Sequence, residues 1–207
     1  MERLCYVKII VKCLKLGFTP IFLNELKIEI QIIIISAGDI FQNLFFLESL
    51  KGKNNLLLAV GSKQVYYHSI TNENTNSVIF LNFIKELINK IKINKNNIYV
   101  LIMDNLPCHK KDDVNQFLVD PKINAVFTAP YNSSFNAVEL SFRSIKRKTY
   151  SNIYCSLEEM KNDIINYLKS KEIEYALRAN FNETIKQYIA YCEQKNSINL
   201  NSFNYID

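Results

Sequence analysis

Apolar residues follow one another without a break at residues 99–103, and this run stops at a carboxylate, Asp104. A short run of β-branched, aromatic and aliphatic residues is typical of a strand that is buried on both faces of a sheet. Similar runs predict further strands at residues 21–26, 56–60, 65–70 and 123–128. Residues 61–63, Gly-Ser-Lys, are expected to join the second and third of these strands as a hairpin turn.

Helical spacing of apolar residues marks most of the chain between and after these strands. It predicts helices at residues 74–92, 110–118, 136–150, 157–168 and 172–192. Residues 1–17 fit either a short amphipathic helix or a strand, and residues 36–55 receive no assignment apart from a turn at Gly38 and Asp39. The order of elements predicts an α/β protein with a mixed five-stranded sheet flanked by helices.

The bulk composition narrows the class of protein. With 207 residues, 48% of them hydrophobic and 22% charged, the chain is suited to one globular domain. Its five cysteines are widely spaced and show no zinc-ligand pattern, which favours a reducing intracellular compartment. Lysines interrupt the apolar N-terminus, and residues 28–37 are too few to span a bilayer, so we expect a soluble protein without a membrane partner.

Two acids stand at positions suited to chemistry. Asp104 ends a buried strand, where α/β proteins place ligands, and Glu139 opens a predicted helix with 34 residues between the two. Plain structural alternatives exist for both. Asp104 could simply end a strand and cap the following turn. Glu139 could complete a capping box with Asn136, or pair with Arg143 on the helix surface.

A wider set of residues carries a family resemblance. They are Asp104, Asn105, His109, the segment 129–131 (Ala-Pro-Tyr), the segment 136–139 (Asn-Ala-Val-Glu) and the basic segment 146–148. Together with the 34-residue gap they resemble the catalytic domain of DDE transposases of the mariner superfamily. Two prolines of that pattern are absent, and Ser134 and Ala137 stand in their places.

The resemblance implies a ribonuclease H-like fold and metal-dependent cleavage and transfer of DNA strands, as in DNA transposition and integration. Such enzymes use two Mg²⁺ or Mn²⁺ ions held by three carboxylates. Asp104 and Glu139 match two of these ligands, while the first acid falls on Asn24, 80 positions before Asp104. An amide is a poorer ligand for a hard cation, and Glu25 points to the opposite face of the strand. We therefore expect Asn24 to impair catalysis.

Residues near these acids receive subordinate roles. Asn105 and His109 are expected close to the site, His109 either beside the phosphate or as a structural histidine bonded to the backbone. The helix from residue 136 has an apolar stripe of Val138, Phe142, Ile145 and Thr149. Its basic residues are Arg143, Lys146, Arg147 and Lys148. We expect these to contact the DNA backbone without strong sequence preference, the alternative being an ordinary solvated face.

The resemblance also suggests how the chain is organised. We expect an N-terminal remnant at residues 1–19, a ribonuclease H-like DDE domain at residues 20–155, and C-terminal helices packed on it at residues 156–207. Relatives carry helix-turn-helix domains before this core, so the chain resembles a truncated transposase. A homodimer, and a nuclear location in a eukaryote, are further expectations. The alternative function is a catalytically inert DNA-binding or interaction module derived from a transposase.

Overall fold

The computed structural model describes residues 2–37, 45–91, 97–110, 112–118, 123–128 and 135–194. Its five strands are β1 (Thr19–Ala37), β2 (Phe45–Val60), β3 (Val65–Thr71), β4 (Tyr99–Met103) and β5 (Ile123–Phe127). They form one sheet in the order β3-β2-β1-β4-β5, in which β1 pairs antiparallel with β2 and parallel with β4. The predicted mixed five-stranded sheet is confirmed.

The helices also follow the predicted order. They are α1 (Glu2–Lys15), α2 (Ser77–Ile91), α3 (Asp112–Phe117), α4 (Ala137–Tyr150), α5 (Leu157–Leu168) and α6 (Lys171–Gln194), with a 3-10 helix at Pro107–Lys110. The helix predicted at residues 110–118 is shorter within the described residues: Lys110 ends the 3-10 helix, and α3 covers Asp112–Phe117. Residues 1–17, which the sequence left open, contain a helix.

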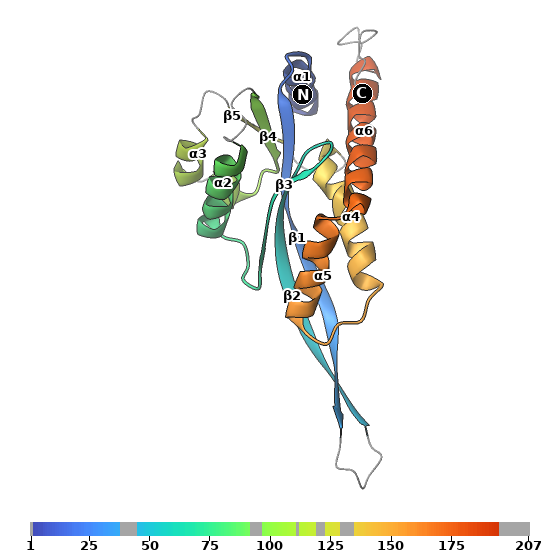
Figure 1. The fold of residues 1–207 in the computed structure, drawn as a ribbon. Coiled ribbons are helices and arrows are strands. Elements are labelled where there is room, and N and C mark those ends of the chain that lie inside the picture. Colours follow the sequence, from blue (N-terminus) through green and yellow to red (C-terminus); the bar gives the residue numbers. More distant parts are fainter. Residues whose placement is uncertain are drawn as a thin grey trace.

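Helices cover both faces of the sheet (Figure 1). Alternate residues of β1 point to opposite faces, since side chains on a strand alternate. Phe22 and Leu26 join a core shared with α1, α4, α5 and α6, whereas Ile21 and Leu23 join a second core shared with α2. Burial of each such side chain contributes roughly 1.5–3 kcal/mol, so both layers anchor the part of β1 that carries Asn24.

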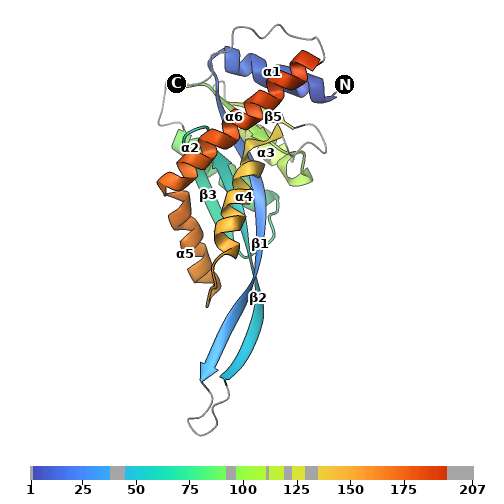
Figure 2. The same ribbon diagram turned by 90° about the vertical axis from the view of Figure 1, so that its right-hand side faces the viewer.

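Strands β1 and β2 are far longer than the strands predicted at residues 21–26 and 56–60, and they pair as one long hairpin. Its register runs without a break from the pair Phe22 and Val60 to the pair Ala37 and Phe45. The far end of this hairpin projects beyond the helices (Figures 1 and 2). Isoleucine fills most of residues 28–35, and β-branched residues favour strands even where no alternation marks a face. The turn expected at Gly38 and Asp39 lies outside the described residues.

Helix α1 is packed into the body of the protein. Tyr6, Val7, Ile10 and Val11 are buried in the larger core, and α1 contacts α6 and β5. Within the ranges that the structure describes, no helix has the length and apolar content needed to cross a membrane.

Candidate functional site

Two adjacent parallel strands bring Asn24 and Asp104 to the same part of the sheet. Leu23 of β1 pairs with Met103, the last residue of β4, so the residue that follows each of them lies at the same level. Asn24 is 6% exposed, and the side chain of Asp104 is 30% exposed. The strand that carries Asn24 continues past this point while β4 ends, which leaves the edge of β1 open there.

The start of α4 sets the position of Glu139. Asn136 caps the helix, since its side-chain oxygen accepts a hydrogen bond from the backbone N–H of Val138 at 3.3 Å. The Nδ2 of Asn136 also donates to the carbonyl of Leu23 at 3.4 Å, which ties the helix start to the residue before Asn24. The predicted stripe of Val138, Phe142, Ile145 and Thr149 is buried.

Asn24 and Glu139 are in direct contact. The Nδ2 of Asn24 donates to Oε1 of Glu139 at 2.5 Å, and its Oδ1 accepts the backbone N–H of Glu25 at 2.8 Å. These partners fix the orientation of the amide, because a backbone N–H can only donate and a carboxylate can only accept. Asn24 therefore presents a donor to Glu139, where a metal ligand would have to present an oxygen.

The plain alternatives for Glu139 are not formed. Its side chain accepts from Asn24 instead of turning back to the N–H of Asn136, as a capping box would require. No ion pair between Glu139 and Arg143 occurs among the described residues. The pKa of Glu139 is raised above its ordinary value. Burial is the largest cause, and the nearby charge of Asp104 also raises the pKa, whereas the Asn24 hydrogen bond and Lys146 lower it.

The buried side chain of His109 contacts Asp104. It is fully buried and stacks on Phe80 with ring centroids 3.9 Å apart. Its Nδ1 lies 2.7 Å from Oδ1 of Asp104 and 3.2 Å from the Asp104 carbonyl oxygen. Asn105, which follows Asp104 in the sequence, donates a hydrogen bond from its side chain to the carbonyl of Thr128, just after β5. Of the two roles expected for His109, the structure thus gives the bond to the backbone, together with a bond to the Asp104 carboxylate.

The donor set does not fit a cage of three oxygen ligands. In the described ranges, no three His, Cys, Asp or Glu residues are grouped closely enough to hold a metal ion. Glu25 lines a cleft beside Glu139 but not on the side of Asn24, because the pairing of β1 with β2 is continuous across Asn24 and Glu25, without a bulge. The two residues therefore keep opposite directions on the strand.

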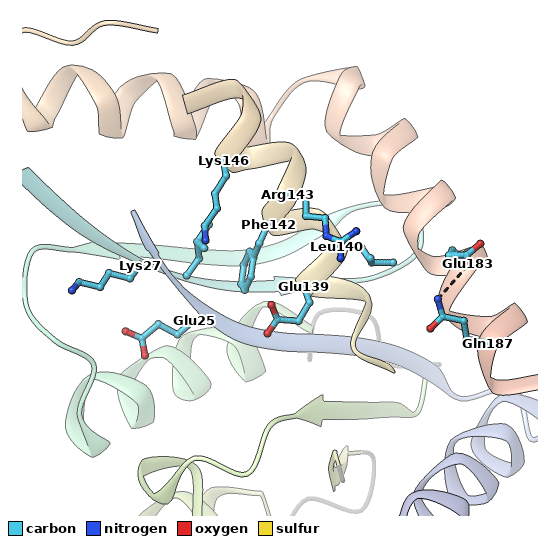
Figure 3. Close-up of a pocket in the computed structure, with 10 residues that line it drawn as sticks. Glu25, Lys27, Glu139, Leu140, Phe142, Arg143, Lys146, Glu183 and Gln187 are labelled. Carbon is cyan, nitrogen blue, oxygen red and sulfur yellow. Dashed lines mark hydrogen bonds between the residues drawn. The ribbon is translucent and has the colours of Figure 1, made fainter. Parts of the chain in front are cut away.

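A cleft of about 590 Å³ opens beside Glu139. Figure 3 shows Glu139, Arg143 and Lys146 of α4 on one side, Glu25 and Lys27 of β1 on another, and α6 beyond them. Leu26 and Phe142 contribute apolar surface, and Glu183 and Gln187 of α6 are joined by a 3.1 Å hydrogen bond. The sequence does not predict that residues of β1 and α6 line this cleft together, since no local pattern indicates that these segments meet.

The predicted basic residues lie on the outer side of α4. Arg143, Lys146 and Arg147 are exposed, and Lys148 is half-buried. Arg143 and Lys146 also line the cleft next to Glu139. A phosphate at this cleft would therefore meet positive charge directly beside the carboxylate.

Comparisons with known proteins concern the family and the fold of the chain. A sequence model of a protein family described as DDE superfamily endonuclease matches residues 48–161, more than half of the chain. No curated protein sequence matches.

Several solved structures share the fold of this chain. The catalytic domain of Mos1 mariner transposase superposes with a TM-score of 0.70 at 13% identity, covering 96% of this chain and 93% of that one. The mariner Mos1 paired end complex with Mg gives 0.73 at 15% identity, covering 96% of this chain and 62% of that one. The Mos1 paired-end complex with left transposon end gives 0.71 at 15%, covering 91% and 59%. The chain thus has the ribonuclease H-like fold, and it spans about three fifths of the longer transposase chains.

Proposed function

Because this chain belongs to the DDE superfamily of endonucleases, we propose that it is a transposase-type catalytic domain impaired in DNA cleavage by Asn24. The reaction to which the domain is suited is metal-dependent DNA strand cleavage and transfer. Asp104 and Glu139 would hold the divalent cation, Mg²⁺ or Mn²⁺, and Asn24 occupies the first acidic position.

One observation carries this proposal: the hydrogen bond from Nδ2 of Asn24 to Oε1 of Glu139. Two divalent ions in such a site would stabilise the attacking and leaving oxygens of a phosphate. Hard cations require oxygen ligands, and carboxylates supply both the oxygen and the compensating charge. The amide removes one charge and uses Glu139 as its own acceptor. Cation binding must therefore compete with an existing hydrogen bond.

DNA is the proposed partner, and its phosphates are the contacted groups. Two solved structures of this fold are described as Mos1 paired-end complexes, one with the left transposon end and the other with Mg. In this chain, the exposed cations of α4 beside Glu139 support binding to the phosphate backbone. We propose residues 20–155 as the DDE domain, with the C-terminal helices packed on it, and a homodimer as the working assembly.

A second candidate function is an inert DNA-binding or interaction module with this fold. The fixed orientation of the Asn24 amide favours it, because the amide cannot turn its oxygen toward Glu139 without losing both hydrogen bonds. The two candidates differ in residual cleavage, and the same experiment separates them.

The test is nicking of supercoiled plasmid in Mn²⁺ or Mg²⁺ by the parent chain, Asn24→Asp and Asn24→Ala. Asn24→Asp restores a carboxylate with almost no change of volume, so nicking should rise clearly above the parent, whereas Asn24→Ala should gain nothing. Adding Glu139→Gln to Asn24→Asp should abolish the gain. A parent already as active as Asn24→Asp would contradict impairment at this position. A persistent lack of nicking in Asn24→Asp would favour the inert module.

A further inference from the structure

The outer face of α4 continues past the cleft and ends on an aromatic ring. Glu139, Arg143, Lys146 and Tyr150 are spaced by four, three and four residues, so they share one side of the helix. Tyr150 is 52% exposed, and Ile153, just after the helix, is 75% exposed. From Glu139 to Tyr150 the helix rises about 16 Å at 1.5 Å per residue.

The cations on this face form no close ion pairs in the described part of the chain, although Lys146 is near enough to Glu139 to lower its pKa. Among the described residues, no carboxylate lies within ion-pairing distance of Arg143, Lys146 or Arg147. Close to the same helix end, the exposed tyrosine differs from Tyr154, which is buried and donates to Asp163 at 2.7 Å. The hydroxyl of Tyr150 has no hydrogen-bond partner in the described part of the chain. Packing therefore does not explain the position of its ring.

Cations in a row, followed by an exposed aromatic ring, suit an unpaired nucleic-acid strand. Its phosphates can lie on the cations while a base stacks on the ring, a combination that tolerates any sequence. A duplex offers only its phosphates to such a face, because its bases are already stacked and paired inside the helix. The face begins at the cleft beside Glu139 (Figure 3), so a strand bound there could run outward along α4.

We propose that Arg143, Lys146, Arg147 and Tyr150 form a binding track for single-stranded DNA, with one base stacked on Tyr150. The inference rests on the proposed function for the presence of DNA at the cleft, and it adds the state of the bound strand. Phosphate contacts to the three cations supply affinity for both forms of DNA, and the stacking contact distinguishes them.

The experiment measures the fluorescence anisotropy of labelled DNA as the full chain is added, with chelator present and at one salt concentration. The two probes are a thymidine oligonucleotide and a duplex of equal length. The parent should bind the single strand more tightly than the duplex. Tyr150→Ala should weaken single-strand binding about fivefold or more, the lower end for base–aromatic stacking. It should leave duplex binding unchanged, and Tyr150→Phe should keep the parent's preference.

Tyr175→Ala is the matched control. Tyr175 is 72% exposed on α6, but Glu172 and Glu174 precede it, so its removal should change neither affinity. Replacing the thymidine oligonucleotide by an abasic one should make the parent and Tyr150→Ala equal, since the stacked base is gone.

Each failure has a separate meaning. If Tyr150→Ala weakens both DNA forms equally, or weakens neither, the stacking track is overturned. The proposed DNA partner still stands in that case if Arg143→Ala lowers the affinity for the duplex. A parent that binds neither form overturns the track together with the proposed DNA partner. A single-strand preference that survives in the abasic oligonucleotide also overturns the inference, because it would then come from the backbone alone.

Discussion

The amide of Asn24 donates a 2.5 Å hydrogen bond to the carboxylate of Glu139, 115 residues further along the chain. A hydrogen bond to a charged group contributes about 1.5–3 kcal/mol, so this contact stabilises the metal-free fold. A carboxylate at position 24 would face Glu139 with like charge unless a cation lay between them. With Asn24, the contact to Glu139 is thus favourable in the absence of a metal ion.

Weak shared binding of Mn²⁺ by Asp104 and Glu139 is the first prediction. A ligand that binds only the folded state raises stability, by about 0.4 kcal/mol when its concentration equals the dissociation constant. For a chain of this length we expect an increase in melting temperature of roughly 1 °C in millimolar Mn²⁺. Thermal unfolding with Mn²⁺ and with chelator measures it.

Asp104→Ala should lose this increase, because one of the two carboxylates is removed. Asp113→Ala, which changes an exposed acid on α3, should keep it. An equal Mn²⁺-induced increase in the parent and in Asp104→Ala would contradict a shared site.

How far the sequence predicts this fold depends on local pattern. The apolar run 99–103 and the helical stripe of α4 were recognisable, because their periodicity reflects burial directly. The full length of β1 was not, since the isoleucine run has no alternation to mark its faces. Residues 1–17 stayed open because lysines interrupt their apolar pattern, although α1 packs tightly on α6.

For the candidate site, the sequence suggests which residues to consider but not the contacts among them. Spacing and motif pointed to Asn24, Asp104 and Glu139, and the sheet register with the cap at Asn136 brings them to one region. Sequence suggested that Asn24 is a weaker ligand. The orientation of its amide, however, depends on the N–H of Glu25, and only the structure shows this contact. The roles of the three residues remain predictions for the nicking experiment.

A second prediction concerns the tyrosines that join both ends of the chain. Tyr188 of α6 donates to the carbonyl of Phe135, and the hydroxyl of Tyr6 in α1 lies 2.9 Å from that of Tyr188. All three residues are buried, so Tyr188→Phe leaves a buried carbonyl and a buried hydroxyl with poorer partners. The free energy of unfolding in urea should fall by about 1–3 kcal/mol.

Tyr175→Phe serves as the control, because its ring is exposed and no such network is lost. The double variant Tyr6→Phe/Tyr188→Phe should lose less than the sum of the single losses, since both hydroxyls belong to one network. If Tyr188→Phe is as stable as Tyr175→Phe, the network does not secure the start of α4.

A third prediction follows from Tyr154. Burial, followed by its hydrogen bond to Asp163, raises the pKa of Tyr154 to about 12. The unfolded chain loses this proton near the ordinary pKa of about 10, so between these values the folded state binds more protons. Stability must then fall as pH rises from about 10 towards 12.

Tyr154→Phe should flatten part of this alkaline loss, measured as the free energy of unfolding in urea between about pH 9 and 11.5. Some loss should persist, because burial also raises the pKa of Tyr6 and Tyr188. Tyr175→Phe should keep the slope of the parent. If the slope is the same in Tyr154→Phe as in the parent, the folded state of the parent does not hold the hydroxyl proton of Tyr154 more tightly than the unfolded state does.

The last prediction tests the basic side of α4 against duplex DNA. Each neutralised phosphate releases counterions, and the logarithm of the association constant falls by about 0.9 per phosphate for each unit of log salt. We expect non-specific dissociation constants of roughly 10⁻⁴–10⁻⁶ M at physiological salt. Lys146→Ala/Arg147→Ala should flatten the slope by about one to two units and weaken two unrelated duplexes alike. Fluorescence anisotropy across a salt series measures both.

The control variant Lys85→Ala/Lys90→Ala removes the same charge from α2, on the opposite face of the sheet, so it separates local contact from net charge. If both double variants show the same slope, the cations of α4 are solvated surface charges, and DNA binds elsewhere.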